Sequence, residues 1–202
     1  MKREGIILII SAPSGAGKTT LCRALLERFP NMRESISYTT RAPRAGEVHG
    51  EDYFFVSREE FQHMIDGDAF AEWAEVHGNL YGTSLATIEE ARKSGVDLVL
   101  DIDCQGARRL KEQIERCVYI FILPPSMEEL RRRLEARSSD AQEVIDSRLE
   151  RAAEEIREAR WYDYIIINDS FEAAFEELAA IVVSHSRTTF RMLEQVAKLF
   201  DI

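Results

Sequence analysis

Four short apolar runs rich in β-branched residues recur along the chain, at residues 6–10, 96–100, 118–123 and 164–167. Within each run, polar and apolar residues do not alternate. Short, predominantly apolar runs of this length are typical of strands that are buried on both faces, as in a parallel sheet. We therefore expect these four segments to form a mainly parallel core sheet.

Helical periodicity marks four longer segments, at residues 19–29, 105–115, 127–136 and 142–160, and predicts a mostly helical tail at residues 171–202. Because helices that connect parallel strands pack on both faces of the sheet, this order of elements predicts a three-layer α/β fold. Two helix starts carry the capping-box pattern, in which a hydroxyl and a glutamate satisfy each other's backbone donors. These pairs are Ser57 with Glu60 and Ser126 with Glu129.

The gap between the first two apolar runs is long enough to hold an inserted lobe. It contains a loop at residues 37–50, candidate strands at 53–56 and 70–76, and two helical segments. A second insertion is helical and strongly charged, and we interpret it as a movable lid. We expect one domain over residues 1–202, with its core at 1–36, 93–126 and 159–202, the lobe at 37–92 and the lid at 127–158.

The charge balance argues against a nucleic acid partner. The chain has a net charge of -10 and no dense basic stripe, so it would repel a polyanion. The apolar run near the N-terminus covers only residues 6–10, far short of the roughly 20 residues that a membrane helix needs. We expect a cytoplasmic protein without a membrane or nucleic acid partner, and the sequence leaves open whether it forms a homo-oligomer.

Cysteine and histidine positions indicate no disulfide framework and no zinc site. Cys22, Cys104 and Cys117 are scattered, and the four histidines form no HExxH pair and no cluster with the cysteines. Zinc sites need ligands at short, regular spacings. We interpret the cysteines as reduced thiols and the histidines as surface or packing residues.

The first apolar run leads into a phosphate-binding loop, and a helix follows at once. The loop residues expected to bind the phosphates of a nucleoside triphosphate are Ala12, Pro13, Ser14, Gly15, Ala16, Gly17, Lys18, Thr19 and Thr20. Glycines let successive N–H groups point into one concavity, the helix start adds positive charge, the lysine reaches the β- and γ-phosphates, and the threonine hydroxyl can bind Mg²⁺. The general pattern GxxxxGK[ST] begins with glycine, whereas this chain has Ala12 there.

An acidic residue follows the second apolar run, where a carboxylate would lie near the Mg²⁺ ion. That residue is Asp101, and Asp103 faces the same way in an extended segment. The alternative is a pair of solvated aspartates at the end of a strand. A phosphate loop with an acidic partner does not by itself choose a reaction, because GTPases, ATPases and small-molecule kinases share it.

Further segments, in order and spacing, closely resemble guanylate kinases. They are residues 37–47 (SYTTRAPRAGE), 50–53 (GEDY), 81–83 (YGT) and 101–103 (DID). The resemblance covers nearly the whole chain, and no single motif carries it. It implies a P-loop fold with a GMP-binding lobe and a helical lid. It also implies the reaction of ATP with GMP to give ADP and GDP, with Mg²⁺, in purine nucleotide metabolism, and dGMP as a further substrate.

The resemblance assigns roles to residues at matched positions. For GMP these are Arg41, Arg44, Tyr53 and Tyr81 at the phosphate, Glu72 and Asp103 at guanine, Ser37 and Thr83 near the base, and Asp101. The implied catalytic residues are Lys18, Arg133, Arg137 and Arg148. Mg²⁺ would be bound directly by Thr19 and through water by Asp101.

Plainer interpretations of these residues stay open at the level of sequence. Arg41 and Arg44 could be solvated loop residues, Glu72 the exposed residue of an alternating strand, and the lid arginines one solvated helix face. The lid also departs from the family, because Ala136 and Ser138 replace the usual glycine-rich turn. This change predicts a stiffer hinge.

Three rival functions are each opposed by a sequence feature. A regulatory GTPase would match the DxxG pattern at residues 103–106, but no NKxD motif follows. A non-catalytic guanylate-kinase-like scaffold module would have an eroded phosphate loop, whereas Lys18 and Thr19 are intact. A kinase for another monophosphate is opposed by Glu72 and Asp103.

Overall fold

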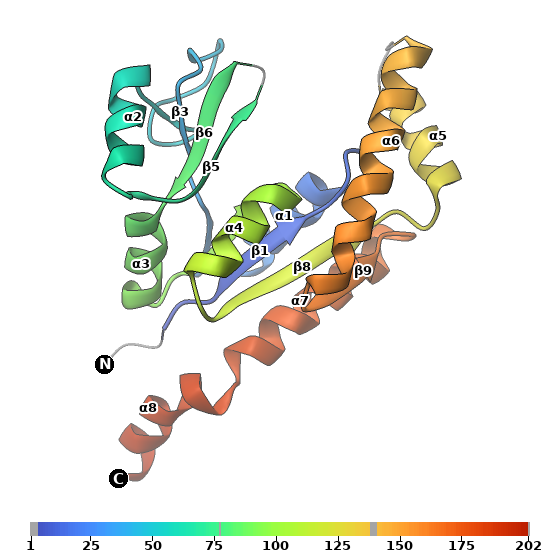
Figure 1. The fold of residues 1–202 in the computed structure, drawn as a ribbon. Helices are drawn as coiled ribbons and strands as arrows, with labels where there is room; N and C mark the ends of the chain where they lie inside the picture. The colour runs from blue at the N-terminus through green and yellow to red at the C-terminus, as the bar shows by residue number, and fades with distance from the viewer. Residues whose placement is uncertain (1–3, 77, 138–140, 202) are drawn as a thin grey trace.

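A computed structural model of the 202-residue chain describes residues 4–76, 78–137 and 141–201. Its central sheet has the strand order β2-β7-β1-β8-β9, and all neighbouring strands run parallel (Figure 1). The strands are β1 (Ile7–Ser11), β2 (Met32–Glu34), β7 (Asp97–Asp101), β8 (Cys117–Leu123) and β9 (Tyr164–Ile167). The parallel sheet and the four strands expected from the apolar runs are confirmed. Both ends of each strand lie within one residue of the predicted run.

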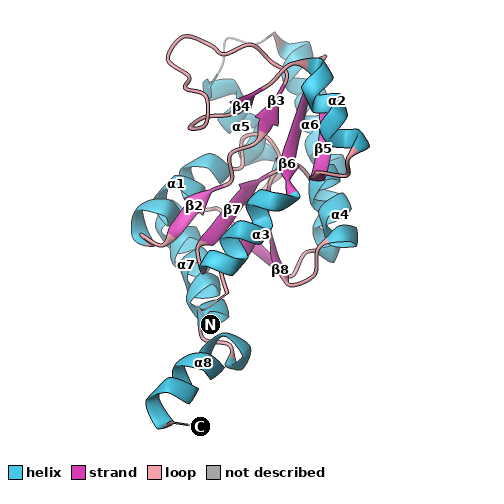
Figure 2. Cartoon of the chain, turned by 90° about the vertical axis from the view of Figure 1, so that its left-hand side faces the viewer, coloured by secondary structure: helices cyan, strands magenta, loops and turns pink. Residues whose placement is uncertain are grey.

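Alternate residues of β1 belong to the two faces of the sheet, and each face has its own apolar cluster. Ile6, Leu8 and Ile10 lie with residues of α1 (Lys18–Arg28) and α7 (Phe171–Ser186). Ile7 and Ile9 lie with residues of α3 (Leu85–Ser94) and α4 (Cys104–Gln113). Figure 2 shows these two helix pairs on opposite sides of the sheet. The predicted three-layer packing is therefore confirmed.

A second, four-stranded sheet forms in the predicted inserted lobe, with the order β4-β3-β6-β5. Its elements are β3 (Tyr38–Thr39), β4 (Phe54–Phe55), α2 (Arg58–Asp66), β5 (Phe70–Val76) and β6 (Asn79–Ser84). Phe61 of α2 stacks on Phe70 of β5 with ring centroids 4.4 Å apart, which joins the helix to the sheet. The capping box of Ser57 with Glu60 is confirmed at the start of α2.

The predicted lid consists of two helices that pack on each other. They are α5 (Met127–Arg137) and α6 (Gln142–Glu158), and a 3-10 turn, Ala159–Trp161, follows. Leu130 and Leu134 of α5 form a small buried cluster with Ile145, Leu149 and Ala152 of α6. At the start of α5, the Glu129 N–H donates to Ser126 Oγ, but the Glu129 carboxylate accepts from Arg132 and Arg133. The hydrogen bond from the Glu129 N–H to the Ser126 hydroxyl confirms one half of the predicted capping box.

The chain closes with α7 and α8 (Thr189–Phe200). Figure 1 shows α8 projecting away from the rest of the molecule, and none of its residues is buried. The predicted helical tail is confirmed, and Phe190, Leu193 and Phe200 of its apolar face are exposed. Among the described residues, no helix combines the length and apolarity needed to cross a membrane.

Candidate active site

The phosphate loop joins β1 to α1 and needs glycine at two places. Gly15 and Gly17 have φ values of +93° and +96°, a region that L side chains rarely adopt. Gly17 is the N-cap of α1, so the helix begins at Lys18. A cavity of about 330 Å³ opens over the loop and is lined by Ala12, Pro13, Ser14, Gly15, Gly17, Lys18, Thr19, Thr20 and Glu155. Eight of the nine residues expected from the sequence therefore meet at this cavity, and Ala16 is buried beneath it.

Lys18 connects the phosphate loop to the next strand of the sheet. Its ammonium group forms an ion pair with Asp101 of β7 and donates to the Ile102 carbonyl over 3.3 Å. Strands β1 and β7 are neighbours, and the connections that leave them cover opposite faces of the sheet. Ligands of open α/β sheets bind in the crevice at such a switch point. Lys18 and Asp101, which the sequence analysis placed at the phosphates and near Mg²⁺ respectively, thus lie in direct contact.

Asn168 supports the phosphate loop from below and was missed in the sequence analysis. Its amide donates to the Ala16 carbonyl over 2.7 Å, and a Cβ built on Gly17 would lie only 2.3 Å from the Asn168 amide nitrogen. The backbone carbonyl of Asn168 in turn accepts from the Arg133 guanidinium of α5 over 3.0 Å. Asn168 thus links the loop to the lid. The position directly after β9 was the available signal, because that strand ends at the same edge as β1.

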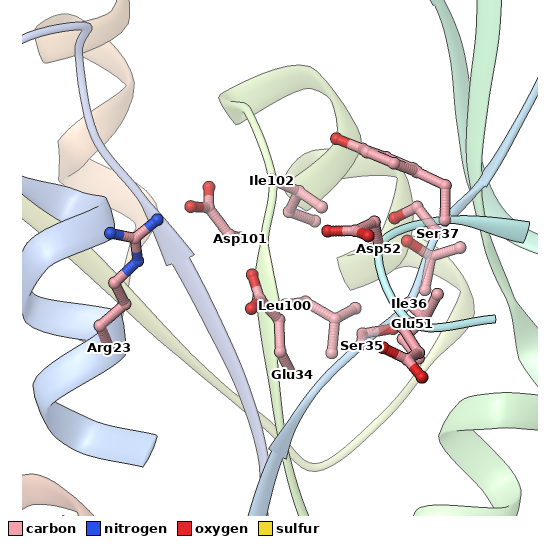
Figure 3. Close-up of a pocket in the computed structure, with 12 residues that line it drawn as sticks. Arg23, Glu34, Ser35, Ile36, Ser37, Glu51, Asp52, Leu100, Asp101 and Ile102 are labelled. Atoms are coloured by element: carbon pink, nitrogen blue, oxygen red, sulfur yellow. The ribbon is translucent and has the colours of Figure 1, made fainter. Parts of the chain in front are cut away.

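A second cavity, of about 460 Å³, lies between the core sheet and the lobe. Its lining residues are Arg23, Glu34, Ser35, Ile36, Ser37, Glu51, Asp52, Tyr53, Thr83, Leu100, Asp101 and Ile102. Figure 3 shows the Arg23 side chain coming from α1 on one side, Ser37 and Asp52 on the other, and the Glu34 and Asp101 carboxylates between them. Four of the predicted GMP residues, Ser37, Tyr53, Thr83 and Asp101, therefore share one cavity.

The sequence analysis missed the charged residues Arg23 and Glu34 of this cavity, and it quoted Glu51 and Asp52 within the GEDY segment without giving either a role. The pKa of the Glu34 carboxyl is raised, first by burial and then by the Asp101 charge, while Arg23 counteracts the rise. These residues come from α1, β2 and the loop before β4. No local sequence pattern marks Arg23 or Glu34, because only the fold brings their segments to the cavity.

Glu72 is buried, with 8% of its surface exposed, so the interpretation as an exposed strand residue is wrong. The Thr83 hydroxyl on the neighbouring strand donates to Glu72 Oε1 over 2.7 Å. Burial raises the pKa of the Glu72 carboxyl, and the Asp103 charge raises it further, against the lowering effect of the Thr83 hydrogen bond. A buried carboxylate has lone pairs on both oxygens, so beside the Thr83 hydrogen bond it is suited to accept from a ligand.

Asp103 is the N-cap of α4, where its carboxylate accepts from the Gly106 N–H over 2.8 Å. A Cβ built on Gly106 would lie 2.9 Å from Glu72 Oε2 and 3.4 Å from Asp103 Oδ1. Both carboxylates therefore approach the first turn of α4, where unpaired N–H groups favour negative charge. The predicted convergence of Glu72 and Asp103 is observed.

Arg41, Tyr53 and Tyr81 gather in the lobe, beside the cavity that Tyr53 lines. The Arg41 guanidinium lies 5.4 Å from the Tyr53 ring centroid, and the two tyrosine rings are 6.0 Å apart. Arg41 forms a two-pronged ion pair with Glu47, at 2.9 and 2.8 Å, which lowers the pKa of that carboxyl. The Arg44 side chain is exposed, and the Arg44 backbone N–H donates to Glu47. Arg41 is thus more than a solvated loop residue, whereas Arg44 points to solvent.

The arginine side chains of the lid differ in their burial and in their hydrogen bonds. Arg133 is half-buried between the Glu129 carboxylate, at 2.7 Å, and the Asn168 carbonyl. Arg148 is half-buried on α6. Arg137 ends α5, but its side chain lies outside the described residues, as does Ser138 of the predicted lid turn. The structure therefore brings Arg133 to the base of the phosphate loop.

Comparisons with known proteins agree with this geometry. The family model described as guanylate kinase matches residues 4–185. The guanylate kinases of Geobacter metallireducens and Geobacter sulfurreducens are 64% and 63% identical over 202 residues, which cover 100% of this chain and of each relative. A crystal structure of guanylate kinase from Anaplasma phagocytophilum superposes with a TM-score of 0.75 at 39% identity, over 100% of this chain and 98% of that one. This chain belongs to the guanylate kinase family.

Proposed function

We propose that this enzyme, a nucleoside monophosphate kinase, transfers the γ-phosphoryl group of ATP to GMP, and also to dGMP, and forms the diphosphate. One observation carries the proposal: the phosphate-loop cavity and the lobe cavity meet at the ion pair of Lys18 with Asp101. Lys18 lines the first cavity and Asp101 lines the second. Two sites joined at one charged pair suit a donor and an acceptor whose phosphates must meet.

The transfer needs positioning and charge neutralisation more than it needs a base. The accepting GMP phosphate is already ionised at neutral pH, so no proton has to be removed before attack. We propose that Lys18 and the lid arginines Arg133, Arg137 and Arg148 neutralise the charge that spreads over the transferring group. Arg133 is already held near the loop through Asn168. Closure of the lid would bring Arg148 over the same phosphates.

The donor set also fits Mg²⁺, which keeps most of its water and takes few protein ligands when phosphates are present. We propose that the Thr19 hydroxyl binds the ion directly and that Asp101 holds its water shell. Thr19 lines the phosphate cavity, and Asp101 lies at its edge beside Lys18. When bound, the ion would neutralise phosphate charge and orient the γ-phosphoryl group.

For the acceptor, we propose that the lobe reads guanine through its N1–H and N2 donors. Glu72 would accept from these donors with support from Asp103, while Ser37 and Thr83 lie near the base. Adenine reverses this pattern of donors and acceptors, so it would leave the buried Glu72 carboxylate without a partner. Selectivity for GMP over AMP follows from that loss.

The GMP phosphate would meet Arg41, Arg44, Tyr53 and Tyr81. Arginine offers paired donors that suit phosphate, and tyrosine adds a hydrogen bond without added charge. Glu47 now accepts from both prongs of Arg41. We expect the phosphate to take the place of Glu47. The exposed Arg44 side chain would fold in on binding.

The remaining parts of the proposal concern organisation and location. We propose that the lobe at residues 37–92, up to the start of α3, and the lid at residues 127–158, apart from its base at the C-terminal end of α6, move against the core when both nucleotides bind. Helix α3 contributes Ile88 and Ala91 to a core cluster, so we expect the lobe to bend on the N-terminal side of this helix.

The cytoplasm, where free thiols persist, suits the three free cysteines.

The test is a panel of monophosphates with ATP and Mg²⁺, comparing GMP, dGMP, AMP, CMP and UMP as acceptors. We expect turnover of GMP and dGMP, and a preference over AMP of about 10⁴ or more in kcat/KM, as for sites that hydrogen-bond their substrate. Faster turnover of AMP than of GMP would overturn the assignment of the acceptor.

A further inference from the structure

The phosphate-loop cavity has an acidic wall that the reaction described above does not use. Of its described lining residues, Glu155 is the one that comes from outside the loop and the first turn of α1. It belongs to α6, the long helix of the lid, which passes beside the loop after β1 (Figure 1). A carboxylate that faces a site for phosphate oxygens opposes their binding, because charges of like sign repel.

The position of Glu155 is set by the core and not by lid closure. The next residue, Ile156, packs against the core cluster that contains Ala159 and Tyr162, where α6 joins the sheet. Arg148 lies seven residues earlier, two helical turns toward the tip of the lid and on the same face. Arg148 therefore moves with the tip, whereas Glu155 stays at the base beside the phosphate loop.

The charges around Glu155 leave its negative charge directed at the cavity. Lys18 forms its ion pair with Asp101 and not with Glu155. Burial raises the pKa of the Glu155 carboxyl first, the Asp103 charge adds to the rise, and Lys18 and Arg151 lower it. The site thus presents one lysine between carboxylates on two sides. Phosphates that enter without a divalent cation must overcome the repulsion from both carboxylates, Asp101 and Glu155.

We propose that Glu155 makes the phosphate-loop site reject phosphate groups that arrive without a divalent cation. Mg²⁺ removes two negative charges from ATP, which reduces the repulsion, and its retained water molecules can donate to a carboxylate. Metal-free ATP offers neither advantage. Glu155 therefore acts as a specificity residue that selects the metal-loaded donor. This inference rests on the proposed ATP site.

The test measures equilibrium binding of ATP by calorimetry, in excess Mg²⁺ and in excess chelator, at one ionic strength. For the Glu155→Gln variant, we expect metal-free ATP to bind about tenfold more tightly than it binds the wild type, as the loss of one nearby like charge predicts. Binding of MgATP should be unchanged or weaker. The ratio of the two dissociation constants should therefore fall by about tenfold or more.

Glu154→Gln is the matched control, because Glu154 is the neighbouring residue and is exposed. It removes the same charge without touching the cavity, so its ratio should equal that of the wild type. Glu155→Ala, which removes both charge and side chain, should repeat the shift seen with Glu155→Gln. Thermal unfolding confirms that each variant is folded.

Two results would overturn the inference while the proposed function stands. One is an unchanged ratio in both Glu155 variants, and the other is an equal shift in Glu154→Gln, which would reveal a general effect of net charge. If the wild type bound ATP neither with nor without Mg²⁺, the proposed function itself would fail. The two failures are thus distinguishable.

Discussion

The Glu72 carboxylate lies where ionisation is unfavourable for the fold but useful for reading a base. It is 8% exposed, and burial raises its pKa above the ordinary value of 4.5. A carboxyl whose folded pKa is raised contributes stability below its unfolded pKa, and this contribution is lost as the pH rises through the folded value. Raising the pH through the folded pKa of Glu72 therefore costs the folded chain stability.

Glu72→Gln should then separate stability from activity. At pH 7 we expect the variant to unfold at a higher temperature than the wild type, since glutamine can still accept from Thr83 without a buried charge. This difference should shrink as the pH is lowered from 7 toward 4.5. In contrast, kcat/KM for GMP should fall by roughly 10²-fold, because a charged acceptor for guanine is lost. Thermal unfolding across pH and steady-state kinetics give both values.

Glu75→Gln is the control for this prediction on the same strand. Glu75 is exposed, and its ion pair with Arg58 at 3.6 Å contributes little. We expect neither the pH-dependent gain in stability nor the loss of GMP turnover in this variant. A Glu72→Gln enzyme that is as active as the wild type would remove Glu72 from the guanine site.

At the scale of elements, the junction of β1 with α1 depends on close approach between Gly17 and Asn168. Gly17 has a φ of +96°, and a Cβ there would lie 2.3 Å from the Asn168 amide nitrogen. That amide donates to the Ala16 carbonyl, so it cannot withdraw without losing its support of the loop. The turn thus excludes side chains for two reasons, backbone conformation and space.

Comparing Gly17→Ala with Gly46→Ala separates these two reasons. Gly46 also has a positive φ, +92°, but nothing lies within 4 Å of a Cβ built there. Each alanine should lose about 1 kcal/mol of unfolding free energy through its backbone conformation, and Gly17→Ala should lose about 1–3 kcal/mol more through overlap. Denaturant unfolding measures the difference. Equal losses in the two variants would show that Asn168 moves aside freely.

Elements with a strong local pattern could be predicted from the sequence, and short or polar ones could not. The apolar runs of β1, β7 and β8 marked the core, because most of their residues are buried on both faces of the sheet. The run of β9 is equally apolar, although Ile165 and Ile167 of this edge strand are exposed. Strand β2 was missed because it has only three residues and two of them, Arg33 and Glu34, are charged. Strands β3 and β6 were missed because one has only two residues and the other contains Asn79 and Gly82, which are of types depleted in strands.

At the scale of the whole molecule, the site is assembled from segments that are far apart in the chain. The phosphate loop is a local motif, so the sequence could predict it with its helix and its glycines. Arg23, Glu34 and Glu155 have no such motif, and they reach the cavities only through sheet order and lid packing. The convergence of Glu72 with Asp103 came from the family resemblance, since the strand pattern alone favoured an exposed Glu72.

The tail is the part of the molecule that the site needs least. Helix α8 has no buried residue, and it is joined to the body by the Arg191 guanidinium, which donates to the Glu4 carbonyl, and by Arg116, 4.8 Å from the Phe190 ring centroid. The family match ends at residue 185, before α8 begins. Nothing in either cavity comes from α8.

Deleting residues 188–202 should therefore leave kcat/KM for GMP within about twofold of the full chain, because exposed contacts of this kind contribute roughly 1 kcal/mol or less each. The unfolding midpoint should fall by only about 2–4 °C per kcal/mol lost. Deleting residues 171–202 is the contrasting variant, since it also removes Ala174, Leu178 and Val182 from the core and should prevent folding. Circular dichroism and a coupled kinetic assay test both. A folded 188–202 deletion with GMP turnover reduced more than about tenfold would mean that α8 supports the site through self-association, because α8 does not reach either cavity within one chain.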